Sequence, residues 1–400
     1  MTHNPASAIQ DLLVFGEFGD VNPSVTDSVT YTFLSPKTME EVFEHEIEGC
    51  FLYSRHWNPI NRYLSQALAG MEGTEAAQVT ASGMSAITST MMQLAGAGDE
   101  VVSARTIYGG TFALLKNFLP RFGVTTRFVD ITDLKAIEKA ITPKTKVLYA
   151  ETVSNPLLEM ADIPALAQLA HAHGIKLVID NTFVPMLITP AAHGADVVVY
   201  SLTKFANGTS DAVAGCICGS KELIGKLTDV NSGACMLMGP VLDSTRAASI
   251  LKNLHSLHVR MRQHSKNAMA LAQWLSAKGL KVHYPGLESH PQHALFGKLM
   301  RPDMGFGGMM TLDAKDAATA SKLMAAMQKD LVGYLAVSLG YFKTLFSAPG
   351  SSTSSEIPKD TQAAMGLTSG LIRFSVGLDD DIERTIGRVE TSLKSVGLLR

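Results

Sequence analysis

The sequence predicts an α/β protein with a mostly parallel sheet, helices on both faces of that sheet, and a smaller C-terminal α/β domain. Short apolar runs such as 176–179 and 197–200 are rich in branched residues, as is typical of strands buried on both faces. Amphipathic stretches alternate with these runs between residues 59 and 201, which indicates repeated β-α-β units. A length of 400 residues is enough for two or three domains.

Composition excludes several classes of protein. Charged residues make up 18% of the chain and the net charge is −3, so a nucleic-acid-binding surface is not expected. No apolar run reaches membrane-spanning length, and the first residues lack the pattern of a signal peptide. Four cysteines in a chain of this length are not a disulfide framework. We therefore expect a soluble cytoplasmic enzyme that contacts neither nucleic acid nor membrane.

Start and stop signals place the individual elements. Residues 1–57 show little periodicity and are expected to form an extended arm. A helix is expected from Pro59 to Glu72, because proline suits a first helical turn and Gly73 follows the end. The later strands are expected at 76–80, 100–103, 125–129, 146–151, 176–180 and 197–200, with helices at 83–94, 111–122, from 133 and at 163–173. A loop at 228–240 and one long helix at 242–278 follow.

Two successive strands end in residues suited to carbonyl chemistry. Asp180 ends one strand, and Lys204 follows the next. In an open α/β sheet, ligands bind outside the carboxyl ends of the strands. Desolvation there favours the neutral amine of Lys204, which attacks carbonyls, although a lysine extending to solvent is the ordinary alternative. A lysine that forms a Schiff base and an aspartate facing a pyridine nitrogen are the pair that a pyridoxal 5′-phosphate site requires.

The motif S-L-T-K-F-A-N-G at 201–208, with D-N-T at 180–182, resembles the Cys/Met-metabolism (trans-sulfuration) family of PLP-dependent enzymes. That family includes methionine γ-lyase, the cystathionine lyases and synthase, and O-acetylhomoserine sulfhydrylase. The resemblance extends from about residue 53 to about residue 377. It implies pyridoxal 5′-phosphate as cofactor and fold type I, with a mostly parallel sheet of the seven-stranded type. One position departs from the family, because Thr209 stands where histidine is usual.

The resemblance also implies how the cofactor phosphate is bound. A small-residue turn leads into the helix expected at 83–94, and free N–H groups at a helix start bind anions. The phosphate ligands implied are Ser82, Gly83, Met84, Ser201 and Thr203. Tyr53 and Arg55 in the arm are implied to bind the phosphate of a neighbouring subunit. The chain is thus expected to form a homodimer as the active unit and a homotetramer overall, whereas packing of the arm on its own subunit is the alternative.

Further site residues follow from the same resemblance. Tyr108 is implied to stack on the pyridine ring and to donate or accept a proton, for which a phenol is suited. Asn155 is implied to bond to the ring hydroxyl and to lie beside the substrate. Arg373, in an apolar run, is implied to bind the substrate α-carboxylate, although a structural ion pair would also satisfy a buried arginine. Ser338 is implied to position the side chain of Lys204.

The chain is expected to divide into an N-terminal arm (1–57) that contacts the partner subunit, a PLP-binding domain (58–251) and a C-terminal domain (252–400). No metal site is expected. His171, His173 and His193 lie on or near predicted helices. Cys216 and Cys218 lie in an apolar strand-like run, in which alternate residues are expected to face opposite ways.

The expected reaction is γ-elimination on a γ-substituted L-amino acid, in the manner of methionine γ-lyase, which releases 2-oxobutyrate and ammonia. Lys204, Tyr108 and Asp180 are the expected catalytic residues. Leu52 and Val337 occupy substrate-binding positions where cystathionine-handling relatives often carry glutamate. A distal ammonium without a partner there would be costly, so cystathionine is less expected.

Several alternatives stay open. Within the family, the chain could catalyse γ-replacement, as O-acetylhomoserine sulfhydrylase does, or remove another leaving group such as that of canavanine. The chain departs from the family at 341–343 and at 350–356. The loop at 350–356 flanks the active site in relatives, which keeps a less usual leaving group open. From other classes, an aminotransferase would require a keto-acid acceptor, and a non-catalytic relative would bind no cofactor.

Overall fold

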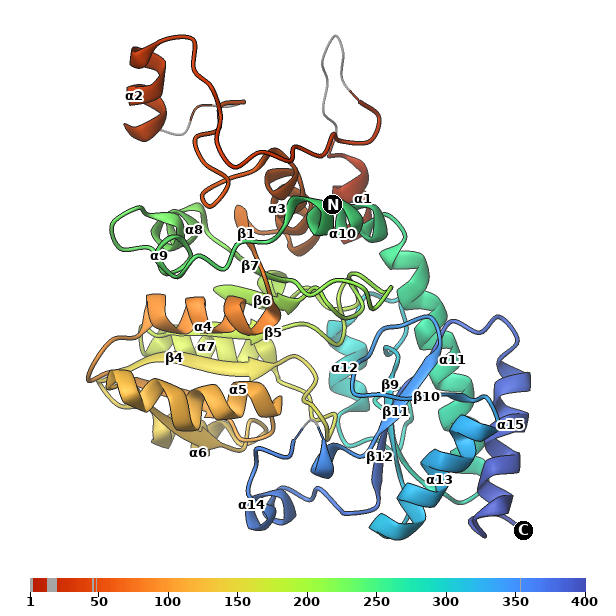
Figure 1. Cartoon of the computed structure of the whole chain (residues 1–400). Coiled ribbons are helices and arrows are strands. Elements are labelled where there is room, and N and C mark those ends of the chain that lie inside the picture. The colour runs from red at the N-terminus through yellow and green to blue at the C-terminus, as the bar shows by residue number, and fades with distance from the viewer. Residues whose placement is uncertain (1–2, 13–19, 45–46, 48, 353) are drawn as a thin grey trace.

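The computed structural model describes residues 3–12, 20–44, 47, 49–352 and 354–400. Two sheets organise it (Figure 1). The larger has the strand order β1-β7-β6-β5-β4-β2-β3, and only β7 runs antiparallel to its neighbours. Its strands are β1 (Ala76–Thr80), β2 (Glu100–Ala104), β3 (Thr125–Val129), β4 (Thr145–Glu151), β5 (Lys176–Asp180), β6 (Val197–Ser201) and β7 (Gly215–Gly219). The predicted mostly parallel seven-stranded sheet is confirmed.

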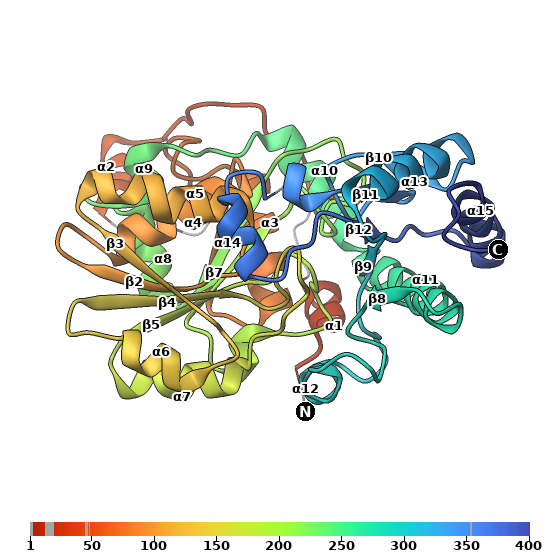
Figure 2. The same ribbon diagram turned by 90° about the horizontal axis from the view of Figure 1, so that it is seen from below.

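Helices cover both faces of this sheet, as predicted. Figure 2 shows α4 (Gly83–Leu94) and α5 (Gly109–Ala113) on one face and α6 (Leu134–Ala140) and α7 (Ile163–Ala172) on the other. The helix α3 (Pro59–Glu72) has the predicted bounds, and Gly73 ends it with a φ of 74°, which favours glycine. The single helix predicted at 111–122 is wrong, because a π-helical turn and a 3₁₀ turn, which contains Pro120, follow α5.

The N-terminal arm contains helices that the sequence pattern did not predict. α1 (Pro5–Gln10) is capped by the Asn4 side chain and packs on α3. α2 (Pro36–Glu44) stands away from both sheets in Figure 1. The prediction of a wholly extended arm is therefore wrong for these two segments. Residues 13–19 of the predicted arm lie outside the described residues.

A second sheet forms the core of the C-terminal region, as predicted. Its strand order is β10-β11-β12-β9-β8. The strands are β8 (Lys281–His283), β9 (Met309–Asp313), β10 (Gly333–Leu335), β11 (Thr344–Ser347) and β12 (Leu371–Ser375), and the helices in and around this region are α12 (His293–Leu299), α13 (Ala317–Lys329), α14 (Lys359–Ala364) and α15 (Ile382–Ser395).

The connection between the two sheets differs from its prediction. Instead of one helix at 242–278, α10 (Ser244–Leu254) ends before α11 (Leu257–Ala277) begins, with Ser256 in a non-helical conformation. Leu257 and Met261 of α11 pack in the core of the larger sheet, whereas later residues pack in the core of the smaller sheet. Two further helices, α8 (Lys221–Thr228) and α9 (Ala234–Met238), precede α10, so the predicted loop at 228–240 contains a helix.

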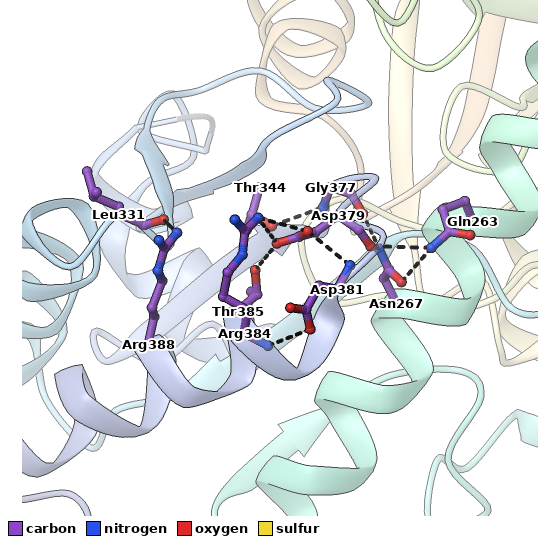
Figure 3. A network of polar contacts seen from close by, with 10 residues as sticks. All are labelled: Gln263, Asn267, Leu331, Thr344, Gly377, Asp379, Asp381, Arg384, Thr385 and Arg388. Atoms are coloured by element: carbon purple, nitrogen blue, oxygen red, sulfur yellow. Dashed lines mark hydrogen bonds and ion pairs between the residues drawn. The ribbon is translucent and has the colours of Figure 1, made fainter.

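Polar contacts hold the chain after β12 against two helices (Figure 3). The Asp379 carboxylate accepts a hydrogen bond of 2.7 Å from the Thr385 hydroxyl on α15. The Asn267 amide on α11 donates to the carbonyl oxygens of Gly377 at 2.9 Å and Asp379 at 2.7 Å. Because β12 carries Arg373, this network fixes the strand that presents that arginine.

The expectation that Cys216 and Cys218 face opposite ways is wrong. Their sulfur atoms lie 3.6 Å apart in β7, because residues i and i+2 of a strand share a face. Both thiols are buried. Within the described residues, no helix combines the length and the apolarity that crossing a membrane requires.

Candidate active site

A cavity of about 280 Å³ lies where the carboxyl ends of the larger sheet meet the smaller sheet. Strands β4, β5 and β6 contribute their last residues to its wall, and β12 contributes Arg373. The predicted residues that line it are Ser82, Gly83, Met84, Tyr108, Asn155, Asp180, Ser201, Thr203, Lys204, Val337 and Arg373. The structure therefore brings together residues that span about 290 positions of the chain.

Lys204 is held at the cavity wall by a neighbouring loop. Its Nζ donates a hydrogen bond of 3.2 Å to the Ser338 hydroxyl, which places Ser338 where the resemblance implied. Burial lowers the pKa of Lys204 to about 8, and the Arg373 guanidinium adds to that effect. Gly340 has a φ of 80°, and a Cβ atom there would lie 2.5 Å from the Phe205 nitrogen. The close approach of these two loops therefore requires glycine.

Asp180 lines the cavity with one carboxylate oxygen fixed by hydrogen bonds. Its Oδ1 accepts hydrogen bonds from the Thr182 amide at 2.9 Å and the Thr182 hydroxyl at 2.5 Å. Burial raises the pKa of Asp180 to about 6, and the Thr182 bonds oppose that rise. A protonated pyridine nitrogen beside the carboxylate would favour its ionised form further.

The phosphate end of the predicted site lies at the start of α4. A Cβ atom at Gly83 would lie 2.7 Å from the Ser201 Cβ, so the helix starts against β6 only with glycine there. The Ser82 hydroxyl caps α4 by accepting from the Ser85 amide at 3.0 Å. The Thr203 hydroxyl bonds to the main chain of Ala214. The amides at the first turn of α4 and the Ser201 hydroxyl are thus the donors most available to an anion.

Tyr108 forms the side of the cavity. Its ring packs against the turn at Gly110, where a Cβ atom would lie 2.5 Å from the Tyr108 Cε1. Burial raises the pKa of Tyr108, and the nearby carboxylate of Glu356 adds to the rise. The phenol is therefore protonated at neutral pH and able to donate its proton.

Arg373 is a buried cation that is ready to bind an anion. Only 2% of the residue is exposed, and its Nη1 donates to the Asn155 Oδ1 at 2.9 Å. Its Nη2 donates to the Val337 carbonyl oxygen at 3.3 Å. No ion pair in the described part of the chain includes Arg373. Since a buried charge needs a partner, this arrangement favours an anionic ligand over the structural alternative.

Four predicted site residues are absent from the cavity wall, and one of them, Ser338, contacts the site through its hydrogen bond with Lys204. The other three lie in the N-terminal arm. Tyr53 is 41% exposed, and the Arg55 guanidinium lies 5.7 Å from the centre of its ring. The Arg55 Nη1 donates to the Met236 carbonyl oxygen at 3.2 Å. Leu52, Tyr53 and Arg55 are absent from the cavity wall of their own chain.

The cavity also contains residues that sequence reasoning missed. They are Ile87, Glu151, Val153, Thr182, Phe183, Val213 and Leu339. Glu151 carries a signal that was available, because it ends a buried strand in the same way as Asp180 does. The apolar members carry no such signal, since they resemble any other core residue.

Comparison with known proteins decides the family. A model of the family described as Cys/Met metabolism PLP-dependent enzyme matches residues 11–391. The chain belongs to this family. It is therefore an enzyme of the PLP-dependent class, as the sequence motifs predicted. Its fold and the convergence of Lys204 with Asp180 agree with that membership.

Individual relatives cover nearly the whole chain. A methionine gamma-lyase from Arabidopsis thaliana is 46% identical over 95% of this chain and 88% of its own length. An L-methionine gamma-lyase from Pseudomonas putida is 39% identical over 94% of this chain and 93% of its own length. An O-succinylhomoserine sulfhydrylase from Pseudomonas aeruginosa is 36% identical over 91% of this chain and 88% of its own length.

A solved structure shows the same fold. A putative O-acetylhomoserine (thiol)-lyase from Campylobacter jejuni superposes with a TM-score of 0.90 at 30% identity, and covers 98% of this chain and 100% of the other. That protein carries a pyridoxyl-lysine phosphate. The residues of the present cavity fit the same group, because Lys204 has a lowered pKa, Asp180 faces the cavity and α4 starts at its edge.

Proposed function

We propose that this chain catalyses γ-elimination on a γ-substituted L-amino acid, in the manner of a methionine γ-lyase, with release of 2-oxobutyrate and ammonia. The observation that carries the proposal is the placement of Lys204 and Arg373 in one cavity. Arg373 is a buried cation without an ion pair among the described residues, which suits an α-carboxylate. Lys204 has its pKa lowered to about 8, which suits a base near neutral pH.

Each residue then has a defined task. The bound pyridoxal ring supplies an acceptor for the electron pair left when a proton leaves the substrate carbon chain. Lys204 would hold the cofactor, and its neutral amine would remove the Cα proton of the substrate and move a proton at Cβ. Asp180 would favour a protonated ring nitrogen. Tyr108 donates a proton to the departing γ-group, while Arg373 and Asn155 orient the substrate.

The rim of the cavity supports an uncharged γ-group. Val337 is 60% exposed and Val213 is 61% exposed in this single chain, and both line the cavity. Leu52 extends the same apolar character if it approaches from a second subunit. A methylthio group loses no hydrogen bonds against such a surface, whereas an ammonium without a partner would be costly. The methionine gamma-lyases among the relatives support the same assignment.

A second candidate substrate, canavanine, carries a guanidino group at its distal end in place of an uncharged methylthio group. Glu356 lies in the segment 350–356 that departs from the family, and its carboxylate lies close enough to Tyr108 to raise that residue's pKa further, beyond the effect of burial. A guanidino group on the γ-oxygen, as in canavanine, would meet this carboxylate beside the acid that protonates the leaving group. The sulfhydrylase among the relatives keeps γ-replacement as the alternative outcome at the same site.

We also propose that the active unit is a homodimer within a homotetramer. Tyr53 and Arg55 would reach the cofactor phosphate of the partner, because they are exposed and lie away from their own cavity. The arm would span residues 1–57, the PLP-binding domain 58–251 and the C-terminal domain 252–400. The four free cysteines support a reducing, cytoplasmic location.

Product analysis tests the proposal. Purified holoenzyme would be incubated with methionine, O-acetylhomoserine, cystathionine and canavanine, each with and without sulfide, and 2-oxobutyrate, ammonia and the released group would be measured. The expected result is 2-oxobutyrate and ammonia from methionine without any added nucleophile. Turnover only in the presence of sulfide would establish γ-replacement instead. A preference for canavanine would assign the leaving group to the second candidate.

A further inference from the structure

Glu151 occupies a central place in the cavity that the proposed reaction does not use. It ends β4 and pairs in register with Asp180 at the end of β5, so both side chains point to the same face of the sheet. Only 7% of Glu151 is exposed, and it lines the cavity. A carboxylate buried in this way is costly unless its oxygen atoms accept hydrogen bonds.

Both oxygen atoms of Glu151 have main-chain partners. The Oε1 accepts from the Tyr108 amide at 2.7 Å, and the Oε2 accepts from the Asn155 amide at 2.7 Å. These two donors lie 47 residues apart in the sequence, in loops that follow β2 and β4. Glu151 therefore joins the two loops that carry Tyr108 and Asn155, both of which line the cavity.

Charges around Glu151 act in opposite directions. Burial and the Asp180 carboxylate raise its pKa to about 8, whereas the two amides and the Arg373 guanidinium lower it. The hydrogen bonds require acceptor oxygens on both sides, which the ionised form supplies without a competing proton. A cationic group on the ring beside Asp180 would offset the repulsion between the two carboxylates.

We propose that Glu151 is a positioning residue of the cofactor site, which fixes the positions of Tyr108 and Asn155 in the cavity wall through their main-chain amides. The carboxylate reaches both loops at once, and a single acceptor cannot replace it. Glutamine at this position would turn its NH₂ group toward one of the two amides and lose that bond. Aspartate would keep the charge but is one methylene too short to span both loops.

The first test measures cofactor binding rather than turnover. Apo-enzyme of wild type and of Glu151→Gln would be titrated with pyridoxal 5′-phosphate, followed by visible absorbance. Glu151→Gln is expected to weaken cofactor affinity about tenfold, the effect of losing one hydrogen bond to a charged group. Glu151→Asp is expected to weaken it to a similar extent.

A second readout separates positioning from ordinary core packing. The pH midpoint of the bound cofactor's visible absorbance is expected to fall in Glu151→Gln, because a negative charge that favours the protonated cofactor is gone, and to stay unchanged in Glu151→Asp. Hydrogen exchange of peptides containing the Tyr108 and Asn155 amides is expected to accelerate in both variants. These readouts do not depend on the reaction, so they remain informative if γ-elimination is disproved.

Glu72 provides a matched control. It is a second buried carboxylate with a pKa raised to about 8 by burial, but its partners are the Ala191 amide and the Tyr200 hydroxyl, outside the cavity. Glu72→Gln is expected to lower thermal stability without changing cofactor affinity. The proposal would be overturned if Glu151→Gln kept a cofactor affinity within twofold of wild type. It would also be overturned if Glu72→Gln lost as much cofactor affinity as Glu151→Gln. If Glu151→Gln does not fold, the affinity and exchange rates of Glu151→Asp decide the question in the same way.

Discussion

The floor and the rim of the cavity are built differently. On the floor, Glu151, Asp180 and Lys204 lie at or just beyond strand ends, and hydrogen bonds from the same chain hold each of them. On the rim, Val337 is 60% exposed and the neighbouring loops depart from the family, while Tyr53 of the N-terminal arm is 41% exposed and lies outside the cavity wall. The difference teaches that hydrogen bonds within one chain already fix the floor, whereas the exposed rim is the part that the proposed partner subunit and the substrate would complete.

Removing the lysine of the floor should have the largest effect. Lys204→Ala is expected to lower turnover by about 10³-fold or more and to abolish the visible absorbance band of the bound cofactor, because both the covalent attachment and the base are lost. Steady-state kinetics and absorbance spectra measure these effects. Lys226→Ala, at an exposed lysine paired with Glu222, is the control and should behave as wild type. Turnover retained in Lys204→Ala would refute the assigned role.

Removing the cation opposite the lysine should have the next largest effect. Arg373→Ala is expected to lower kcat/KM by about 10- to 100-fold, because a hydrogen bond to a charged group contributes roughly 1.5–3 kcal/mol. The loss should appear mainly in KM. Arg127→Ala, which removes an exposed arginine paired with the mostly covered Glu100, is the matched control. Unchanged kinetics in Arg373→Ala would reject the carboxylate clamp.

Substitution of Arg55 in the N-terminal arm should cause a loss of activity that a second, differently substituted chain restores. Arg55→Ala is expected to weaken cofactor affinity about tenfold, as loss of one charged phosphate contact implies. Co-expression of Arg55→Ala with Lys204→Ala chains is expected to restore activity, because a mixed dimer contains one site with neither defect. If the arm binds the cofactor of its own subunit, no site of a mixed dimer should be intact. The site of the Lys204→Ala chain should be inactive, and the site of the Arg55→Ala chain should stay impaired.

The pH dependence of the reactivity of Lys204 should show a smaller effect. Burial, assisted by Arg373, lowers the pKa of Lys204 to about 8, so its neutral amine becomes the dominant form above that pH. The rate at which an amine-specific reagent modifies Lys204 in the apo-enzyme is therefore expected to rise with pH through a midpoint near 8. Arg373→Gln should move this midpoint upward, because removal of a neighbouring cation favours the protonated amine. A midpoint near 10.5 in wild type would contradict the buried placement.

The smallest expected effect concerns the rim carboxylate. Glu356 is exposed, so its substitution should change kcat/KM only a few-fold. Glu356→Gln is expected to impair turnover of canavanine and to leave methionine unaffected, as parallel kinetics on both substrates would measure. Glu390→Gln, at an exposed pair with Lys394 on α15, is the control. An equal change for both substrates would remove the argument for a cationic leaving group.

The comparison also separates what local sequence pattern predicts from what it does not. Strands 76–80 and 176–180 and helix 59–72 have their predicted bounds, because branched apolar runs and a Pro-to-Gly helix frame act over a few residues. The predicted helices at 111–122 and 242–278 are each divided. The second division falls between Leu254 and Leu257, although both helix ends pack in the core of the larger sheet. The change to the core of the smaller sheet comes later within α11, and no local signal carries that information.

By itself, the sequence determined the fold class, the family and the pairing of Lys204 with Asp180, since each depends on residue type and spacing along neighbouring strands. Only the tertiary structure decided that Glu151 joins two loops, that Arg373 lacks an ion-pair partner among the described residues, and that the arm residues lie away from their own cavity. The physical reason is distance along the chain. The contact of Glu151 with the Tyr108 amide joins residues 43 positions apart, and the contact of Arg373 with Asn155 joins residues 218 positions apart. Such contacts depend on how distant parts of the chain pack, whereas a motif depends on neighbouring residues.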